Sequence, residues 1–132
     1  MALTDRDREI LQINQAMLES VVNGDWNAYA NLCSDDLSCF EGETNGLLAE
    51  GLPFHRFYFD LPTGDDEPGP SPVNVSMGRP HLRWLSDDAV VLSYTRLTQR
   101  LQQGNPITQS CCETRIWQRR DGRWSQVHVH RS

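Results

Sequence analysis

Lysine is absent from this chain of 132 residues, so its twelve basic side chains are all arginine. A run of about 20 apolar residues, which a membrane-spanning helix needs, is also missing. The first seven residues are polar and acidic, without the basic and apolar segments of a secretion signal. These absences argue against an integral membrane protein and predict a cytoplasmic location.

Motifs for metal binding are lacking as well. The four cysteines, Cys33, Cys39, Cys111 and Cys112, form no CxxC pair and no cysteine–histidine spacing typical of zinc sites. Without an export signal, they are expected to remain reduced thiols. The sequence therefore predicts no metal site and no cofactor.

The chain carries a net charge of -6, which argues against general binding of nucleic acids. This charge is unevenly distributed. Residues 1–70 contain 3 arginines and 14 acidic side chains, whereas residues 71–132 contain 9 arginines and 4 acidic side chains. Two explanations stay open: the two halves complement each other in the fold, or the basic half faces an anion.

The pattern of apolar residues predicts one α+β domain over residues 1–132. Helical spacing comes first and a period of two follows, which is typical of a curved antiparallel sheet covered on one face by N-terminal helices. Such a cone encloses a pocket. Helices are expected at 5–22, 26–32 and 52–61, a short strand at 37–41, loops at 43–51 and 62–72, and strands at 73–85 (interrupted near 78–80), 89–101, 107–119 and 123–131.

Three arginines are predicted on the inner face of this sheet. Arg96, Arg115 and Arg131 each share a strand face with apolar residues, such as Val127 and Val129 beside Arg131. An unpaired buried cation costs several kcal/mol, so each guanidinium needs an anionic partner.

Two kinds of partner are open. The first is internal pairing with Glu41, Glu113 or Asp60. The second is a small carboxylate or phosphate ligand, held by bidentate hydrogen bonds from the arginines.

Histidines offer a second kind of candidate. His55 lies in an aromatic segment, where we interpret it as a packed core residue, with a catalytic base as the alternative. His128 and His130 alternate with the inward valines of the last strand. We therefore expect both on the outer face, at solvent or at a subunit contact.

Several segments resemble the association (hub) domain of calcium/calmodulin-dependent protein kinase type II. They occur in the same order and extend over nearly all residues from about 8 to 132. The matching segments are NGDWNAY (23–29), FE (40–41), EGLPFHRFYF (50–59), YTRLTQ (94–99), ETRIWQRRDGRW (113–124) and VHVHRS (127–132).

This resemblance implies an NTF2-like cone that self-associates, with domains paired through their sheets and dimers stacked into rings. It also implies a pocket that accepts a small carboxylate. By motif position, the residues implied at that pocket are Tyr29, His55, Arg96, Arg115 and Arg131, with Glu41 nearby. Calmodulin binding is implied only as a label of the family.

The chain also departs from the family. It contains no glycine-rich phosphate loop, no catalytic Asp loop and no metal-binding Asp motif of a kinase, and no calmodulin-binding segment. A stand-alone, hub-like protein without kinase activity is therefore expected. Loop 61–72 is longer than in the family, and Cys112 replaces an acidic residue, so ring size and any pocket gate stay open.

Three functional hypotheses follow. The leading one is a non-catalytic oligomerisation domain whose partner is itself, with an anion-accepting pocket. The alternative is a small enzyme of the isomerase, dehydratase or cyclase type, in which His55 acts as base and Arg115 stabilises an enolate. The third is an adaptor that binds a kinase or another protein through the exposed sheet or through the acidic loop 61–72.

Overall fold

The computed structural model describes residues 2–61 and 72–132. Helices dominate the first half of the chain and long strands the second half, as the periodicity predicts. The elements are α1 (Asp5–Val22), α2 (Trp26–Asn31), β1 (Cys33–Phe40), the 3₁₀ turn η1 (Gly42–Thr44), β2 (Ala49–Glu50), α3 (Leu52–Phe59), β3 (Val73–Ser86), β4 (Ala89–Gln102), β5 (Asn105–Arg120) and β6 (Arg123–Arg131).

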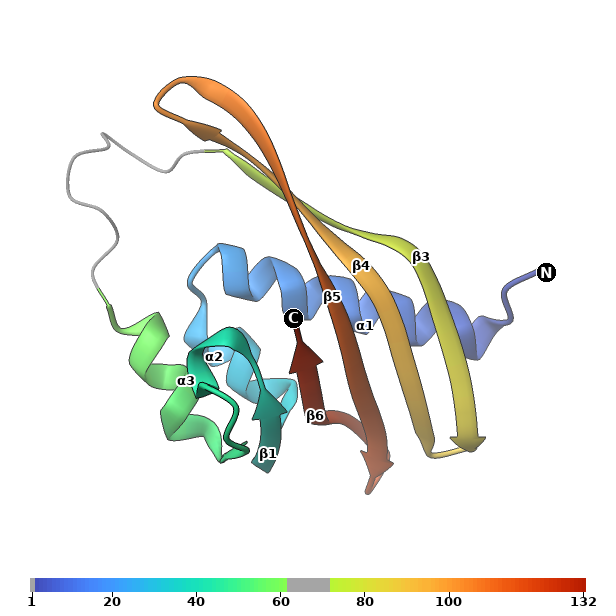
Figure 1. Cartoon of the computed structure of the whole chain (residues 1–132). Helices are drawn as coiled ribbons and strands as arrows, with labels where there is room; N and C mark the ends of the chain where they lie inside the picture. Colours follow the sequence, from blue (N-terminus) through green and yellow to red (C-terminus); the bar gives the residue numbers. More distant parts are fainter. Residues whose placement is uncertain (1, 62–71) are drawn as a thin grey trace.

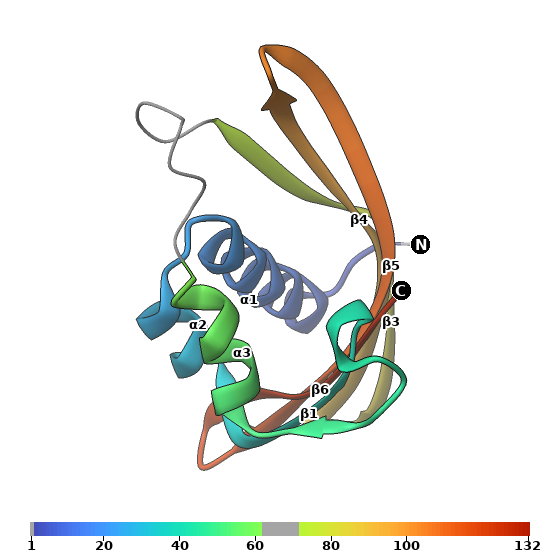
Figure 2. The ribbon, with the colours of Figure 1, turned by 60° about the vertical axis from the view of Figure 1, so that its left-hand side comes forward.

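The six strands form one curved sheet in the order β2-β1-β6-β5-β4-β3. Helices α1, α2 and α3 lie on its concave side, and none of the described helices covers the opposite side of β3, β4 and β5 (Figures 1 and 2). This arrangement confirms the predicted α+β cone. One pairing differs from an all-antiparallel sheet, because β1 runs parallel to β6.

Helix α1 anchors the core against this concave face. Thr4 caps its first turn, and the side chains of Thr4 and Asp7 exchange hydrogen bonds with each other's backbone amides. Its buried side chains then face the sheet, where Asn14 accepts a hydrogen bond from Trp117 Nε1 at 3.0 Å. The fully buried core side chains include Ile10, Met17, Leu18, Leu37, Val90, Leu92, Trp117 and Val129.

Two local predictions were wrong. The short strand expected at 37–41 begins earlier, at Cys33, because the register between β1 and β6 shifts between Cys33 and Ser38 and lets Asp35 and Asp36 stay exposed within β1. The predicted loop at 43–51 overlaps η1 and contains the short strand β2. Most of the predicted loop at 62–72 lies outside the described residues.

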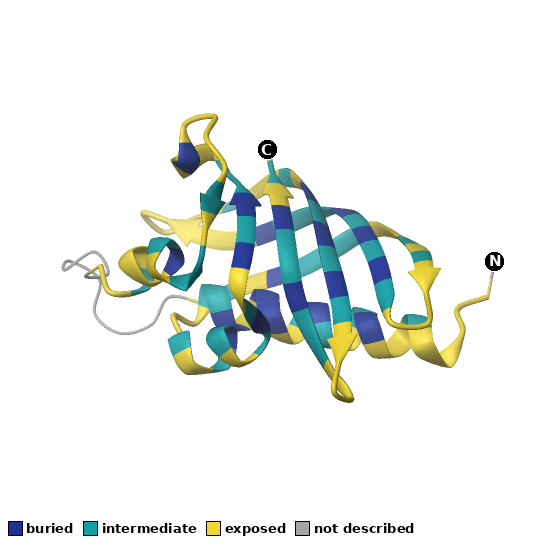
Figure 3. Cartoon of the chain, turned by 90° about the horizontal axis from the view of Figure 1, so that it is seen from below, coloured by how far each residue is buried: buried dark blue, intermediate teal, exposed yellow. Residues whose placement is uncertain are grey.

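A bulge in β6 changes which side chains point inward. Ile116 pairs with His128, but the next residue, Trp117, pairs with Gln126, so the register shifts by one residue. Gln126 is therefore fully buried, whereas Val127, which the alternation placed inside, is only half-buried. Buried residues alternate with less buried ones along the strands in Figure 3. None of the described helices is long and apolar enough to cross a membrane.

Candidate functional site

The buried carboxylate of Glu113 joins the inward side chains of β4 and β5. Tyr94 donates a hydrogen bond to its Oε1, and Arg115 donates to the same oxygen from Nε at 3.0 Å and from Nη2 at 2.8 Å. The Nη1 atom of Arg96 lies 3.1 Å from the second oxygen, Oε2. One carboxylate therefore serves two guanidinium groups.

Arg115 is the most deeply buried of the predicted arginines, with 3% of its side chain exposed. Its Nη1 donates a hydrogen bond to Gln126 Oε1, and Gln126 in turn donates from Nε2 to the sulfur of Cys33 at 3.2 Å. The guanidinium of Arg115 is therefore fixed by Glu113 through Nε and Nη2 and by Gln126 through Nη1. Gln126 was missed by strand alternation, because the β6 bulge turns it inward.

A second group of charges lies where β1 and β6 end. Arg131 Nη2 lies 2.7 Å from Glu43 Oε2 and 3.8 Å from Glu41 Oε2. The other carboxylate oxygen of Glu41 lies 3.6 Å from His55 Nε2. Glu43 was not predicted, because it belongs to the segment expected to be a loop and follows no periodic pattern.

Asp60, the remaining candidate partner, does not reach the inner face. Its carboxylate pairs instead with Arg56 on α3, 3.5 Å away, and both side chains are exposed. The inward arginines that the structure describes are thus matched by Glu113, Glu41 and Glu43. Each of these arginines therefore has at least one carboxylate neighbour, with Glu113 shared between Arg96 and Arg115.

His55 is packed among aromatic rings, as the sequence interpretation expected. It is 8% exposed, and its ring centroid lies 5.8 Å from that of Tyr29 and 5.6 Å from that of Phe54. Both ring nitrogens are buried, and within residues 2–61 and 72–132 neither has a hydrogen-bond partner. His128, by contrast, lies on the other side of the sheet, with Nδ1 2.7 Å from Ser38 Oγ.

Ionisation in the Glu113 network follows from burial and neighbouring charge. Burial opposes the charge on Glu113, but Arg115, Arg96 and the hydroxyl of Tyr94 outweigh it, so the pKa of Glu113 lies below its usual value. Burial likewise raises the pKa of Tyr94 to about 12. At neutral pH the network therefore holds a carboxylate, two guanidinium ions and a neutral phenol.

Acidification is expected to destabilise the fold through Glu113. Because its folded pKa lies below the unfolded value, its contribution is present above about pH 4.5 and is lost as pH falls through the folded pKa. Replacing Tyr94 by Phe removes one donor to the ionised form, which shifts this loss to higher pH. Urea midpoints measured from neutral to acid pH test the prediction, and identical pH profiles for wild type and Tyr94→Phe contradict it.

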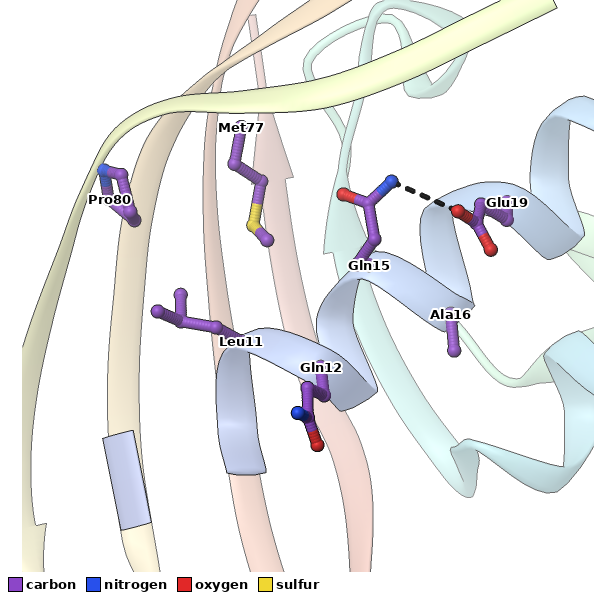
Figure 4. A pocket seen from close by; sticks show the side chains of 7 residues that line it. All are labelled: Leu11, Gln12, Gln15, Ala16, Glu19, Met77 and Pro80. Atoms are coloured by element: carbon purple, nitrogen blue, oxygen red, sulfur yellow. Dashed lines mark hydrogen bonds between the residues drawn. The ribbon is translucent and has the colours of Figure 1, made fainter. Parts of the chain in front are cut away.

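Two pockets among the described residues lie away from these arginines. One is a groove between α1 and β3, where Leu11, Gln15 and Met77 face one another (Figure 4). The other lies at the open ends of β3, β4 and β5, around Arg100 and Ile107. Neither is lined by Arg96, Arg115 or Arg131.

The comparison with known proteins gives a consistent result. Residues 6–132 match the family described as calcium/calmodulin dependent protein kinase II association domain. Over 128 residues the chain is 40% identical to the delta subunit of calcium/calmodulin-dependent protein kinase type II from Oryctolagus cuniculus. This match covers 96% of the chain but 24% of the rabbit protein, so the chain spans about a quarter of that relative's length.

Solved structures agree over almost the whole chain. The hub homology domain from Chlamydomonas reinhardtii is 42% identical with a TM-score of 0.89, and the match covers 95% of each chain. The association domain from C. elegans is 36% identical with a TM-score of 0.85, covering 96% of this chain and 95% of that one. An NTF2-like protein from Rhodospirillum rubrum, 21% identical with a TM-score of 0.70 over 93% of this chain and 96% of that one, shows the fold alone.

Proposed function

We propose that this chain, which belongs to the calcium/calmodulin dependent protein kinase II association domain family, acts as a self-associating hub domain. The observation that carries the proposal is the family match over residues 6–132. Two solved relatives, 42% and 36% identical, are a hub homology domain and an association domain. Self-association would make the chain a scaffold that brings copies of an attached or bound protein together, in the cytoplasm.

The surface proposed for this contact is the helix-free face of the sheet. Val91, Ile116 and His128 are partners in consecutive strands and form a row across β4, β5 and β6. By alternation they point away from the buried Trp117 and Val90. Two copies that pack these faces together would bury apolar side chains that no helix of their own chain covers (Figure 2).

Sedimentation velocity over a range of micromolar concentrations tests the proposal. The expected species is larger than a chain of 15.1 kDa at every concentration. A single species of monomer mass throughout would contradict it. Amine-reactive cross-linkers are unsuitable for this question, because the chain contains no lysine.

A small carboxylate ligand is the second candidate function. The observation that favours it is the sharing of Glu113 between two guanidinium groups, which leaves Arg96 without a carboxylate of its own. Arg96 and Arg131 keep 19% and 25% of their side chains exposed, so a ligand could reach them from solvent. Arg115, which is buried more deeply, would add positive charge to the site without contacting solvent. Tyr29, His55 and Glu41 would lie beside the ligand.

Calorimetric titration with short hydroxy and keto acids tests this ligand. Wild type is expected to bind, and Arg96→Gln is expected to lose about 10-fold or more in affinity, because it removes one charged hydrogen-bonding group. Arg119→Gln is the matched control, since Arg119 is an exposed guanidinium paired with Asp88. If none of these acids binds to wild type, the arginines have a purely internal role and the ligand proposal is wrong.

The enzyme hypothesis gains no support from the geometry. His55 is buried and lines neither of the two pockets described above. A base must reach the proton that it removes from a substrate. The hub proposal is therefore the better supported of the two.

A further inference from the structure

We propose that Cys39, Glu41 and His55 form a binding site for Zn²⁺. One ligand atom from each residue, a sulfur, a carboxylate oxygen and an imidazole nitrogen, lies within 4.8 Å of the other two. These are the three donor types that zinc uses in proteins. The sequence predicted no metal site because these three residues are not spaced as in a zinc motif. In the structure they come together because helix α3 packs on β1.

The positions of the three residues suit a single ion. Cys39 and Glu41 are two residues apart at the end of β1, so they project to the same side, and Cys39 is fully buried there. His55 comes from α3, which packs on β1. Ligand bonds of about 2.0–2.3 Å in a tetrahedron separate the donor atoms by about 3.3–3.8 Å. The 3.6 Å between His55 Nε2 and Glu41 Oε1 already falls in this range.

The unpartnered ring of His55 is the independent sign of a ligand. A buried polar atom without a partner costs about 1–3 kcal/mol, and such atoms are uncommon in folded proteins. Neither nitrogen of His55 makes a hydrogen bond within residues 2–61 and 72–132, although the ring is only 8% exposed; Nε2 comes within 3.6 Å of Glu41 Oε1, beyond hydrogen-bond distance. Coordination by one of them would give the buried imidazole a strong partner.

The charges of the donors themselves suit a divalent cation. Arg131 approaches Glu43 more closely than Glu41, at 2.7 Å against 3.8 Å, so the Arg131–Glu43 pair is neutral by itself. Glu41 then contributes one negative charge and a Cys39 thiolate contributes another. These two anionic donors together offset the 2+ charge of a bound Zn²⁺, with the thiol proton released to solvent, while Arg131 stays 3.8 Å from Glu41.

The proposed ion does not depend on self-association, because all three donors belong to one chain. Three protein ligands leave a fourth position of the tetrahedron open to water. Binding would tie α3 to the end of β1 and stabilise the fold by mass action.

Titration of the metal-free protein with Co²⁺ tests the site directly. Wild type is expected to bind one ion per chain, with the visible bands of a tetrahedral complex and a thiolate-to-cobalt charge-transfer band. Cys39→Ser should abolish the charge-transfer band, and Glu41→Gln should weaken binding about 10-fold or more. Competition with a chromophoric chelator then gives the Zn²⁺ affinity of the same proteins.

Matched controls separate this site from other thiols and histidines. Cys112→Ser removes an exposed thiol, and His128→Asn removes the half-buried histidine on the far side of the sheet, so both should keep the wild-type spectrum. Thermal unfolding of each metal-free variant checks that it remains folded. A wild-type spectrum without a thiolate band, or the same spectrum in folded Cys39→Ser, would overturn the proposal.

Discussion

Replacing Glu113 by Gln is expected to lower the free energy of unfolding by about 3–5 kcal/mol, because it leaves a buried cation without its counter-charge. Arg115 is 3% exposed and donates two of its hydrogen bonds to Glu113, so it cannot turn to water. Its other side-chain acceptors, the amide oxygen of Gln126 and the hydroxyl of Tyr94, are neutral. Chemical denaturation of the purified variant measures the effect.

Asp88→Asn is the matched control for this experiment. It breaks a pair with Arg119 of the same 2.8 Å length, but both of those side chains are exposed. Exposed pairs contribute about 0–1 kcal/mol, so the control should stay close to wild type. Equal losses in the two variants would mean that burial of Arg115 is not what makes Glu113 important.

Replacing Ile116 by Asp is expected to dissociate the assembly into single chains. Ile116 lies in the middle of the helix-free face, between Val91 on β4 and His128 on β6. Two copies packed through this face would each bury an unpaired carboxylate close to the symmetry axis, which is strongly unfavourable. The measured quantity is the sedimentation coefficient at the concentration where wild type is assembled.

The variant must remain folded for this result to count. Ile116 points away from the core, so Ile116→Asp should leave the near-ultraviolet circular dichroism unchanged. Gln12→Asp adds the same charge on the exposed side of α1 and should keep the wild-type assembly. If the Ile116→Asp protein sediments like wild type, the helix-free face of the sheet is not the interface.

Strand alternation predicted the inward positions of Arg96 and Arg115 because β4 and β5 pair without interruption from Ala89 with Gln118 to Gln102 with Asn105. In such a ladder the period of two holds along the whole strand. The ion-pair partner of Arg115 could also be predicted from the sequence, since Glu113 is two positions away on the same strand and therefore shares its face. Glu43, which the sequence did not offer as a partner, makes the shorter carboxylate contact of Arg131.

The parts that the sequence did not predict have local causes. A bulge that places Gln126 inward depends on how β6 pairs with β5, and the residues around it carry no glycine or proline to mark it. The cluster of Cys39, Glu41 and His55 joins two elements that no sequence spacing relates. Parallel pairing of β1 with β6 is likewise set by tertiary packing, not by the composition of either strand.

Counting the subunits by native mass spectrometry tests the central claim most directly. If the chains pair face to face through their sheets, every assembly contains an even number of copies, and its mass is an even multiple of 15.1 kDa. The account predicts such an even-numbered species as the dominant one. A dominant single chain, or an odd number of copies, would contradict it.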